Sequence, residues 1–284
     1  MTGLVCRTSV WCLSKRPLWY LLIAVLVGIL PPAAMAKDAA RISGGSSFFE
    51  GFESLDRSRW QIANGWSNNS DQGCVWSSSN VKLVGKRMSL VLNNRRSDGK
   101  DFSCAELQSR EHYGHGTYEA RMRPAAGPGI VSAFFSYAGP AHGADKSQER
   151  WFSFDFVGRD LKTLHLGFHA AGGRDHRHKV SLAFDPSESM NDYAIQWTPQ
   201  AVRWFVNGQL VHALDIGPTE PKTNVPAKVF VSLRNGVGDG QAAWLGQFEY
   251  DGRPLLTTYE YIAFTELGAP CRFPTSVVCA QARP

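Results

Sequence analysis

The sequence lacks the marks of several large protein classes. Its formal net charge is only +5, and no run of basic residues alternates with aromatic residues, so nucleic acid is not an expected partner. It has no helical heptads, no internal repeat of about 20–50 residues and no low-complexity linker, which excludes coiled coils, solenoids and strings of small domains. No CxxC pair or His/Cys spacing typical of zinc sites occurs. A chain of 284 residues without these features is expected to form one large domain.

The amino-terminal region has the three-part layout of a secretory signal peptide. Two basic residues precede an apolar run over residues 18–30, and small residues follow at 34–36. The run is shorter than the ~20 residues of a membrane helix, so an uncleaved anchor is the weaker alternative. We predict a signal peptide over residues 1–36, a secreted or periplasmic mature chain that begins near Lys37, and no membrane association after cleavage. Cleavage leaves 27 basic and 25 acidic residues, a formal charge of +2.

Four cysteines remain in the mature chain: Cys74, Cys104, Cys271 and Cys279. An even number of cysteines in an oxidising compartment predicts two disulfides.

Short runs with period-two alternation dominate the mature sequence, separated by Gly, Asn, Asp and Pro at intervals of about 8–12 residues, which is typical of an all-β sandwich. We predict strands at residues 81–92, 116–122, 130–137, 151–157, 193–197, 202–206, 230–233 and 259–264. Asn207-Gly208 predicts a two-residue hairpin turn. Two segments depart from the pattern: a polar loop at 138–150 and a basic, His-rich loop at 170–179.

The predicted strand at 151–157 carries an unusual mixture of side chains. Phe152, Phe154 and Phe156 share one face, which predicts a core face, while Trp151, Ser153 and Asp155 share the other. An aromatic ring beside polar groups suits a sugar, whose C–H face stacks on the ring while its hydroxyls form hydrogen bonds. The alternative is an ordinary solvated strand face.

Five blocks of the sequence occur in the order and near the spacing of one known family. They read GCVWSSSNVKL, DFSCAELQS, YGHGTYEARMRPAAGPGIVSAFFSYAGPAHG, FDFVGRD and YAIQWTPQAVRWFVNG. This part of the chain resembles the bacterial lichenases and related endo-β-glucanases of glycoside hydrolase family 16. The resemblance implies a β-jelly-roll of the concanavalin A-like type over residues 37–265, with two antiparallel sheets and a concave cleft for a β-linked polysaccharide, followed by a tail at 266–284.

The resemblance also implies a defect in the family's catalytic motif. The family's active strand reads Glu-x-Asp-x-Glu, in which the first Glu is the nucleophile, the Asp tunes it and the last Glu is the acid/base. Here the three positions hold Trp151, Ser153 and Asp155. A retaining glycosidase needs two carboxyl groups ~5–5.5 Å apart, so the expected nucleophile is missing. Glu149 lies on the same face, but about 20 Å from Asp155 along the strand.

Residue-by-residue matching implies a cleft that is half retained. The retained sugar-contacting types are Asn68, Glu106, Phe135, Tyr137 and Trp244, and the altered positions are Gln108, Gly167, His169, Ser232 and Arg234. The alternatives are that Glu106 caps nearby amides and that Phe135 belongs to the core.

The altered positions add positive or titratable groups: Arg234, His165 and His169, with Arg174, His176, Arg177, His178 and Lys179 nearby. Guanidinium groups pair well with carboxylates, so this lining favours an acidic polysaccharide. The alternative is that residues 174–179 are only a solvated loop. His165 and His169 could also form a metal pair, but no third ligand is evident.

Two further features follow from the resemblance alone. A structural calcium site would fall at Gly51, Gly85 and Glu260, where the longer glutamate alters the geometry. The family blocks that hold Cys74 and Cys104 place them beside adjacent strands, so these two would pair, which leaves Cys271 and Cys279 to close a small loop in the tail beyond the family core.

Three functions stay open at this stage. The first is a monomeric polysaccharide-binding protein that needs no cofactor and is catalytically impaired. The second is an active endo-β-glycanase or transglycosylase, with Asp155 as acid and Glu106 as partner in an inverting arrangement that tolerates ~6.5–9.5 Å. The third is a component of an exopolysaccharide export system that binds another protein. A cleft blocked by the loop at 138–150 would favour the third.

Overall fold

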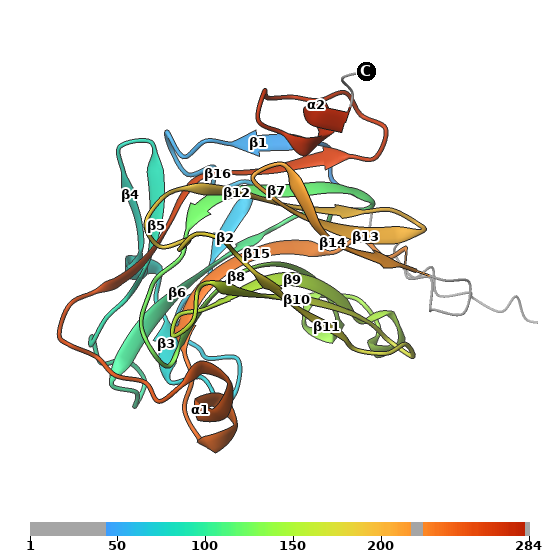
Figure 1. Ribbon diagram of the computed structural model, residues 1–284. Helices are drawn as coiled ribbons and strands as arrows, with labels where there is room; N and C mark the ends of the chain where they lie inside the picture. Colours follow the sequence, from blue (N-terminus) through green and yellow to red (C-terminus); the bar gives the residue numbers. More distant parts are fainter. Residues whose placement is uncertain (1–43, 217–223, 282–284) are drawn as a thin grey trace, which may run out of the picture. The chain divides into compact units, whose positions relative to one another are not determined.

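The computed structural model describes residues 44–216 and 224–281, so the predicted signal peptide lies outside the described residues. The described chain forms two stacked β-sheets (Figure 1). The first sheet has the order β14-β13-β12-β7-β16-β5-β4, with β1 paired to β16. The second has the order β11-β10-β9-β8-β15-β6-β2, with β3 paired to β6. Every pair within these two orders is antiparallel, which confirms the predicted sandwich.

The strands of the first sheet are β1 (Phe48–Glu50), β4 (Val81–Val84), β5 (Arg87–Leu92), β7 (Gly116–Arg123), β12 (Asn191–Trp197), β13 (Ala201–Val206), β14 (Gln209–Asp215) and β16 (Leu255–Glu266). Those of the second are β2 (Trp60–Ile62), β3 (Cys74–Trp76), β6 (Phe102–Ser109), β8 (Ile130–Ala138), β9 (Arg150–Val157), β10 (Thr163–Ala170), β11 (His176–Ser181) and β15 (Lys228–Asn235). The helical elements are the α-helices α1 (Asp239–Leu245) and α2 (Val277–Gln281) and the 3₁₀ turns η1 (Ser78–Asn80), η2 (Pro140–His142) and η3 (Lys146–Gln148). In the described ranges, no helix is both long and apolar enough to cross a membrane.

The core lies between the sheets and is built by alternation along the strands. Phe152, Phe154 and Phe156 of β9 are fully buried, as predicted, and burial of each contributes about 1.5–3 kcal/mol. Trp204 of β13 donates a hydrogen bond of 3.1 Å from Nε1 to the carbonyl of Ser153, which ties the first sheet to β9 of the second. The opposite face of β9 is therefore fixed in position by a packed layer behind it.

Two boundaries differ from the sequence predictions. Residues 81–92 form two strands, β4 and β5, because Gly85 has a φ of 62° and allows a tight turn there. The basic segment at 170–179 is a loop only in part, since His176 begins β11, which pairs with β10. The hairpin at Asn207-Gly208 is confirmed, with φ of 48° and 78° as a type I′ turn requires.

Both disulfides pair as the resemblance implies. Cys74 on β3 is bonded to Cys104 on β6, and Cys271 is bonded to Cys279 in the tail.

The carboxy-terminal tail packs against the first sheet. Ser276 Oγ and the Val277 amide donate hydrogen bonds of 2.7 and 2.9 Å to the carboxyl group of Glu119, which is buried on β7. Val277 forms a small apolar cluster with Ala194 and Phe205. The tail is therefore folded onto the face of the first sheet that points away from the second.

Candidate functional site

The strand register aligns side chains in rows across the outer face of the second sheet. One row runs from Glu106 on β6 through Ser232 on β15 and Ala133 on β8 to Asp155 on β9 and His165 on β10. Neighbouring strands lie ~4.8 Å apart, so the backbones of Glu106 and Asp155 are about 14 Å apart. The side chains between them are small, which leaves a hollow flanked by two carboxyl groups.

This hollow is a cavity of about 340 Å³, and it gathers most of the predicted site residues. Its lining comprises Asn68, Glu106, Val131, Ala133, Phe135, Tyr137, Trp151, Ser153, Asp155, Arg177, Ser232, Arg234 and Trp244. An adjoining cavity of about 700 Å³ is lined by Gln108 and shares Asn68, Glu106, Phe135 and Tyr137 with the first. The structure therefore brings the predicted cleft residues together in one extended cleft, except for Gly167 and His169, which line neither cavity.

Trp151, at the position matched to the nucleophile, packs against the neighbouring strand. A Cβ added to Gly167 would lie 2.3 Å from Cζ3 of Trp151, so the indole lies across the bare backbone of β10. The guanidinium of Arg177, on β11, stacks over the same ring at 4.2 Å. The ring of His169 stacks beside it at 5.9 Å, and His169 Nδ1 lies 2.6 Å from Asp175 Oδ1. Trp151, Gly167 and Arg177 thus form one packed unit on the cleft wall.

Asp155 retains the position matched to the acid/base but has few partners. Ser153 Oγ donates a hydrogen bond of 2.9 Å to Asp155 Oδ2. Burial raises the pKa of Asp155, while this hydrogen bond and the guanidinium groups of Arg177 and Arg234 oppose the rise. Asp155 is the single carboxyl group on this face of β9, because Trp151 and Ser153 hold the other two positions of the motif.

Glu106 faces Asp155 across the hollow, and only 3% of its surface is exposed. Burial raises its pKa to about 8, against the smaller opposing effect of Arg234, so the carboxyl group is largely neutral at pH 7. No described amide donates to it, so the structure gives no support to a capping role. Arg234 lies over the ring of Trp244 at 5.9 Å and donates to Gln241 Oε1 at 3.2 Å. Phe135 lines both cavities and stacks on Phe230, so it belongs to the cleft.

The two histidines considered as a metal pair have other partners. Trp244 Nε1 lies 3.4 Å from His165 Nδ1, and His169 contacts Asp175. Among residues 44–216 and 224–281, no group of three His, Cys, Asp or Glu side chains is arranged to hold a metal ion.

Sequence reasoning missed the residues at the far end of the cleft. Trp66, His142, Lys228 and Phe230 line the larger cavity. Alternation could have revealed Lys228, which shares a face of β15 with Ser232 and Arg234. Its Nζ lies 3.5 Å from Gln108 Oε1, so the neighbouring strand places a cation beside this altered position.

The loop at 138–150 borders the cleft without filling it. Ala141 and His142 form part of one wall of the larger cavity, which stays open beside them. The blocked cleft that would have favoured a protein ligand is therefore absent from the described structure.

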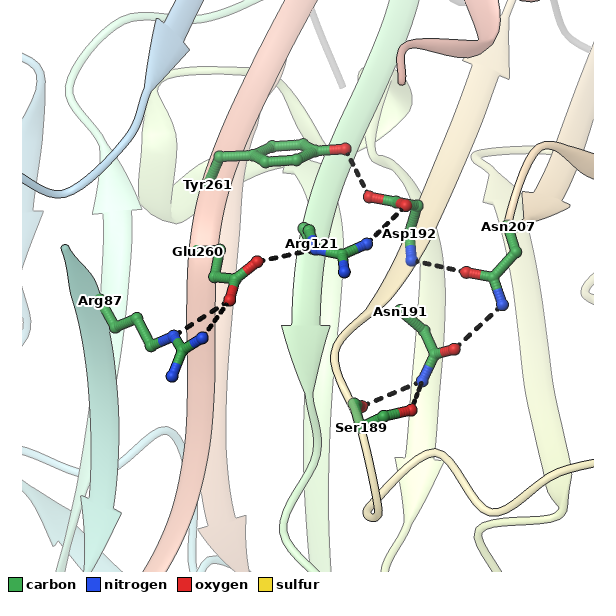
Figure 2. A network of polar contacts seen from close by, with 8 residues as sticks. All are labelled: Arg87, Arg121, Ser189, Asn191, Asp192, Asn207, Glu260 and Tyr261. Carbon is green, nitrogen blue, oxygen red and sulfur yellow. Dashed lines mark hydrogen bonds and ion pairs between the residues drawn. The ribbon is translucent and has the colours of Figure 1, made fainter. Parts of the chain in front are cut away.

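The three positions matched to a calcium site lie together, but the acidic one is already paired with two arginines. Gly51, Gly85 and Glu260 line one cavity on the first sheet. Arg87 Nη2 lies 2.5 Å from Glu260 Oε1, and Arg121 Nε lies 2.7 Å from Oε2 (Figure 2). Both oxygens of the only acidic candidate ligand are thus engaged by guanidinium groups. Arg121 also pairs with Asp192, which accepts a hydrogen bond from the Tyr261 hydroxyl.

Comparison with known proteins matches this sequence and fold. The family described as glycosyl hydrolases family 16 matches residues 68–252. The chain is 33% identical over 237 residues to the endo-1,3-1,4-beta-glycanase ExoK of Rhizobium meliloti (strain 1021), covering 84% of this chain and 85% of the relative. It is 32% identical to a beta-glucanase of Bacillus subtilis (strain 168), covering 86% and 97%. The crystal structure of Bacillus licheniformis beta-glucanase matches with a TM-score of 0.71 at 33% identity, covering 79% of this chain and all of that one. With its sequence and fold in agreement, the chain belongs to glycosyl hydrolase family 16.

Proposed function

We propose that this protein binds a β-linked, acidic polysaccharide in the cleft of its second sheet without hydrolysing it by the retaining mechanism. The relatives named as beta-glucanases support a β-linked ligand. The predicted signal peptide would place the protein outside the cytoplasm, in the periplasm or beyond, where such polymers are met. It is expected to act as a monomer.

The observation that carries the proposal is the packing of Trp151. Retaining hydrolysis requires a carboxylate that attacks the anomeric carbon, ~5–5.5 Å from the acid/base. At that position the indole lies across Gly167 with Arg177 on its ring. The nearest acid toward the start of β9, Glu149, contacts the Tyr137 hydroxyl at 3.0 Å and the Lys146 ammonium. Glu149 is therefore held away from Asp155.

The charges of the cleft support an acidic ligand. Arg177 and Arg234 line the same cavity as Glu106 and Asp155. Burial raises the pKa of Glu106 to about 8, so this carboxyl group adds little negative charge to offset the two guanidinium groups at pH 7. Stacking on Trp151 also holds the Arg177 guanidinium in place, and a guanidinium so held can bind a carboxylate with two hydrogen bonds.

A second candidate function, hydrolysis with inversion, is favoured by the row that joins Glu106 to Asp155. The residues between them, Ser232 and Ala133, have small side chains, and the cavity they line has a volume of about 340 Å³. An inverting enzyme also needs one of its two carboxyl groups to be an ionised base. With Asp155 as the acid, Glu106 would have to be that base, but burial raises the pKa of Glu106 to about 8, so it is mostly protonated at pH 7. Binding without cleavage is therefore the better supported function.

The test measures binding and cleavage on the same samples. Mature protein is incubated with neutral and acidic β-linked oligosaccharides, and calorimetric affinity is compared with the formation of new reducing ends. We expect binding without new reducing ends. Turnover by the wild type that disappears in Asp155→Ala and in Glu106→Gln would establish inverting hydrolysis instead. An absence of binding to every oligosaccharide would refute the proposed function.

A further inference from the structure

The larger half of the cleft has the architecture of a sugar subsite. Phe135 and Phe230 stack face to face, with their ring centres 4.8 Å apart and their planes 10° apart, and both line the cavity as an apolar wall. Trp66 lines the same cavity and is 39% exposed, so its ring can stack against a ligand. Asn68 and Gln108 add polar groups to this lining. Aromatic surfaces combined with a few polar groups suit the two kinds of surface on a pyranose ring.

Lys228 places an amine in this cavity without a counter-charge. The side chain is half-buried, and in the described structure no carboxylate lies within ion-pairing distance of it. Its nearest polar partner is the neutral amide of Gln108, at 3.5 Å. Burial and the nearby positive charge of Arg110 lower the pKa of Lys228, and no acidic group opposes them. A half-buried cation normally has a partner, so this one is poised to receive an anion.

The groups around Lys228 do not supply that anion. His142 shares the cavity, and burial together with Lys228 and His112 lowers its pKa to about 4, so its ring is neutral at pH 7. Burial also lowers the pKa of His112. Glu106 is the only acidic residue in the lining, and its pKa of about 8 keeps it mostly protonated. A bound oxyanion would therefore meet one positive charge and no fixed negative charge.

We propose that the Lys228 subsite, formed by Trp66, Gln108, His142, Lys228 and Phe230, binds a sugar unit whose anionic substituent contacts the Lys228 ammonium. This inference rests on the proposed polysaccharide binding and assigns part of its selectivity to a residue outside the catalytic motif. The shared chemistry is an oxyanion attached to a sugar, and either a carboxylate or a sulfate ester supplies it.

Lys228 is well placed for such a role in a continuous ligand. It pairs with Tyr137 on β8, which pairs with Trp151 on β9. This row joins the Lys228 subsite to the packed unit of Trp151, Gly167 and Arg177. A chain of linked sugars that lies along the cleft can thus contact cationic side chains at both ends.

The test compares Lys228→Gln with Lys228→Arg and with the control Lys82→Gln, which removes an exposed lysine from β4 of the other sheet. Calorimetry measures the affinity of each variant for three β-linked oligosaccharides of equal length: neutral, uronic acid-containing and sulfated. Loss of a charge-assisted contact is expected to weaken binding of at least one anionic ligand about tenfold or more. Binding of the neutral ligand should be unchanged, and Lys228→Arg and Lys82→Gln should resemble the wild type. The two anionic ligands distinguish carboxylate from sulfate.

The possible failures are separable. If Lys228→Gln binds anionic and neutral ligands as the wild type does, or loses both equally, the Lys228 subsite is refuted while polysaccharide binding stands. If the wild type binds only the neutral ligand, every proposal of an acidic ligand falls. If the wild type binds none of the three, the proposed function falls together with the subsite. An unchanged melting temperature for Lys228→Gln confirms that its folding is intact.

Discussion

Replacing Gly167 with alanine is expected to displace Trp151 and destabilise the protein. The new Cβ would lie 2.3 Å from Cζ3 of Trp151 and 3.0 Å from Ser153 Oγ, whereas carbon atoms prefer about 3.5–4.0 Å. The indole must therefore move by more than about 1 Å or adopt another rotamer. Its stacking with Arg177 would be disturbed as a result.

The cost in the free energy of unfolding can be bounded from three effects. Overpacking of this kind costs about 1–3 kcal/mol, and a disturbed cation–π contact at a partly exposed site costs about 0.5–1 kcal/mol. Alanine also restricts the unfolded chain, which offsets about 0.4–1 kcal/mol where the backbone tolerates it. A net loss of about 1–3 kcal/mol in the free energy of unfolding is expected. Affinity for the polysaccharide should fall as well, because Trp151 and Arg177 both line the cleft.

A double-mutant cycle isolates the contact. Urea denaturation is measured for the wild type, Gly167→Ala, Trp151→Ala and the double variant, with Gly114→Ala as control because a Cβ there meets no atom within 4 Å. In the Trp151→Ala background the glycine substitution should cost less than about 0.5 kcal/mol, so the coupling should exceed about 0.5 kcal/mol. If Gly167→Ala costs the same with and without Trp151, the packed unit does not exist as described.

The remaining predictions concern the first sheet. Burial raises the pKa of Glu119 from 4.5 to about 7, so its contribution to stability is fully present below pH 4.5 and is lost as the pH rises through 7. The stability of Glu119→Gln relative to the wild type should therefore rise between pH 5 and pH 8, by at most about 3 kcal/mol. Urea denaturation at several pH values measures the two free energies of unfolding. A difference between them that does not change with pH would contradict the prediction. Adding calcium or a chelator should leave the melting temperature unchanged, because Arg87 and Arg121 form ion pairs with both oxygens of Glu260. An ion that did bind would stabilise the folded protein by about 2.7 kcal/mol at a calcium concentration 100 times its Kd. A clear rise in melting temperature with calcium would show that the ion displaces the arginines.

Local chemistry allowed much of the sandwich to be predicted from the sequence. Alternation assigned Phe152 to the core and Asp155 to the opposite face, because successive side chains of any strand point to opposite sides. Asn207-Gly208 predicted its hairpin because both residues readily adopt positive φ. Such features depend on a few neighbouring residues, so they can be read without knowing which strands pair.

The resemblance placed the cleft, but the contacts within it depend on strands that are distant in sequence. Lys228 lies beside Tyr137 and Gln108 only because β15 pairs with both β8 and β6. The register of these pairs is set by burial of the whole core and not by any short motif.

What the sequence determined by itself was therefore the alternation of each strand, its tight turns and the identity of the altered catalytic positions. Only the tertiary structure decided that Trp151 lies across Gly167, that Glu260 is held by Arg87 and Arg121, and that the tail is anchored on Glu119. The physical reason is that each of these contacts joins elements that the chain brings together only when both sheets have formed, and its energy depends on burial that no single strand possesses.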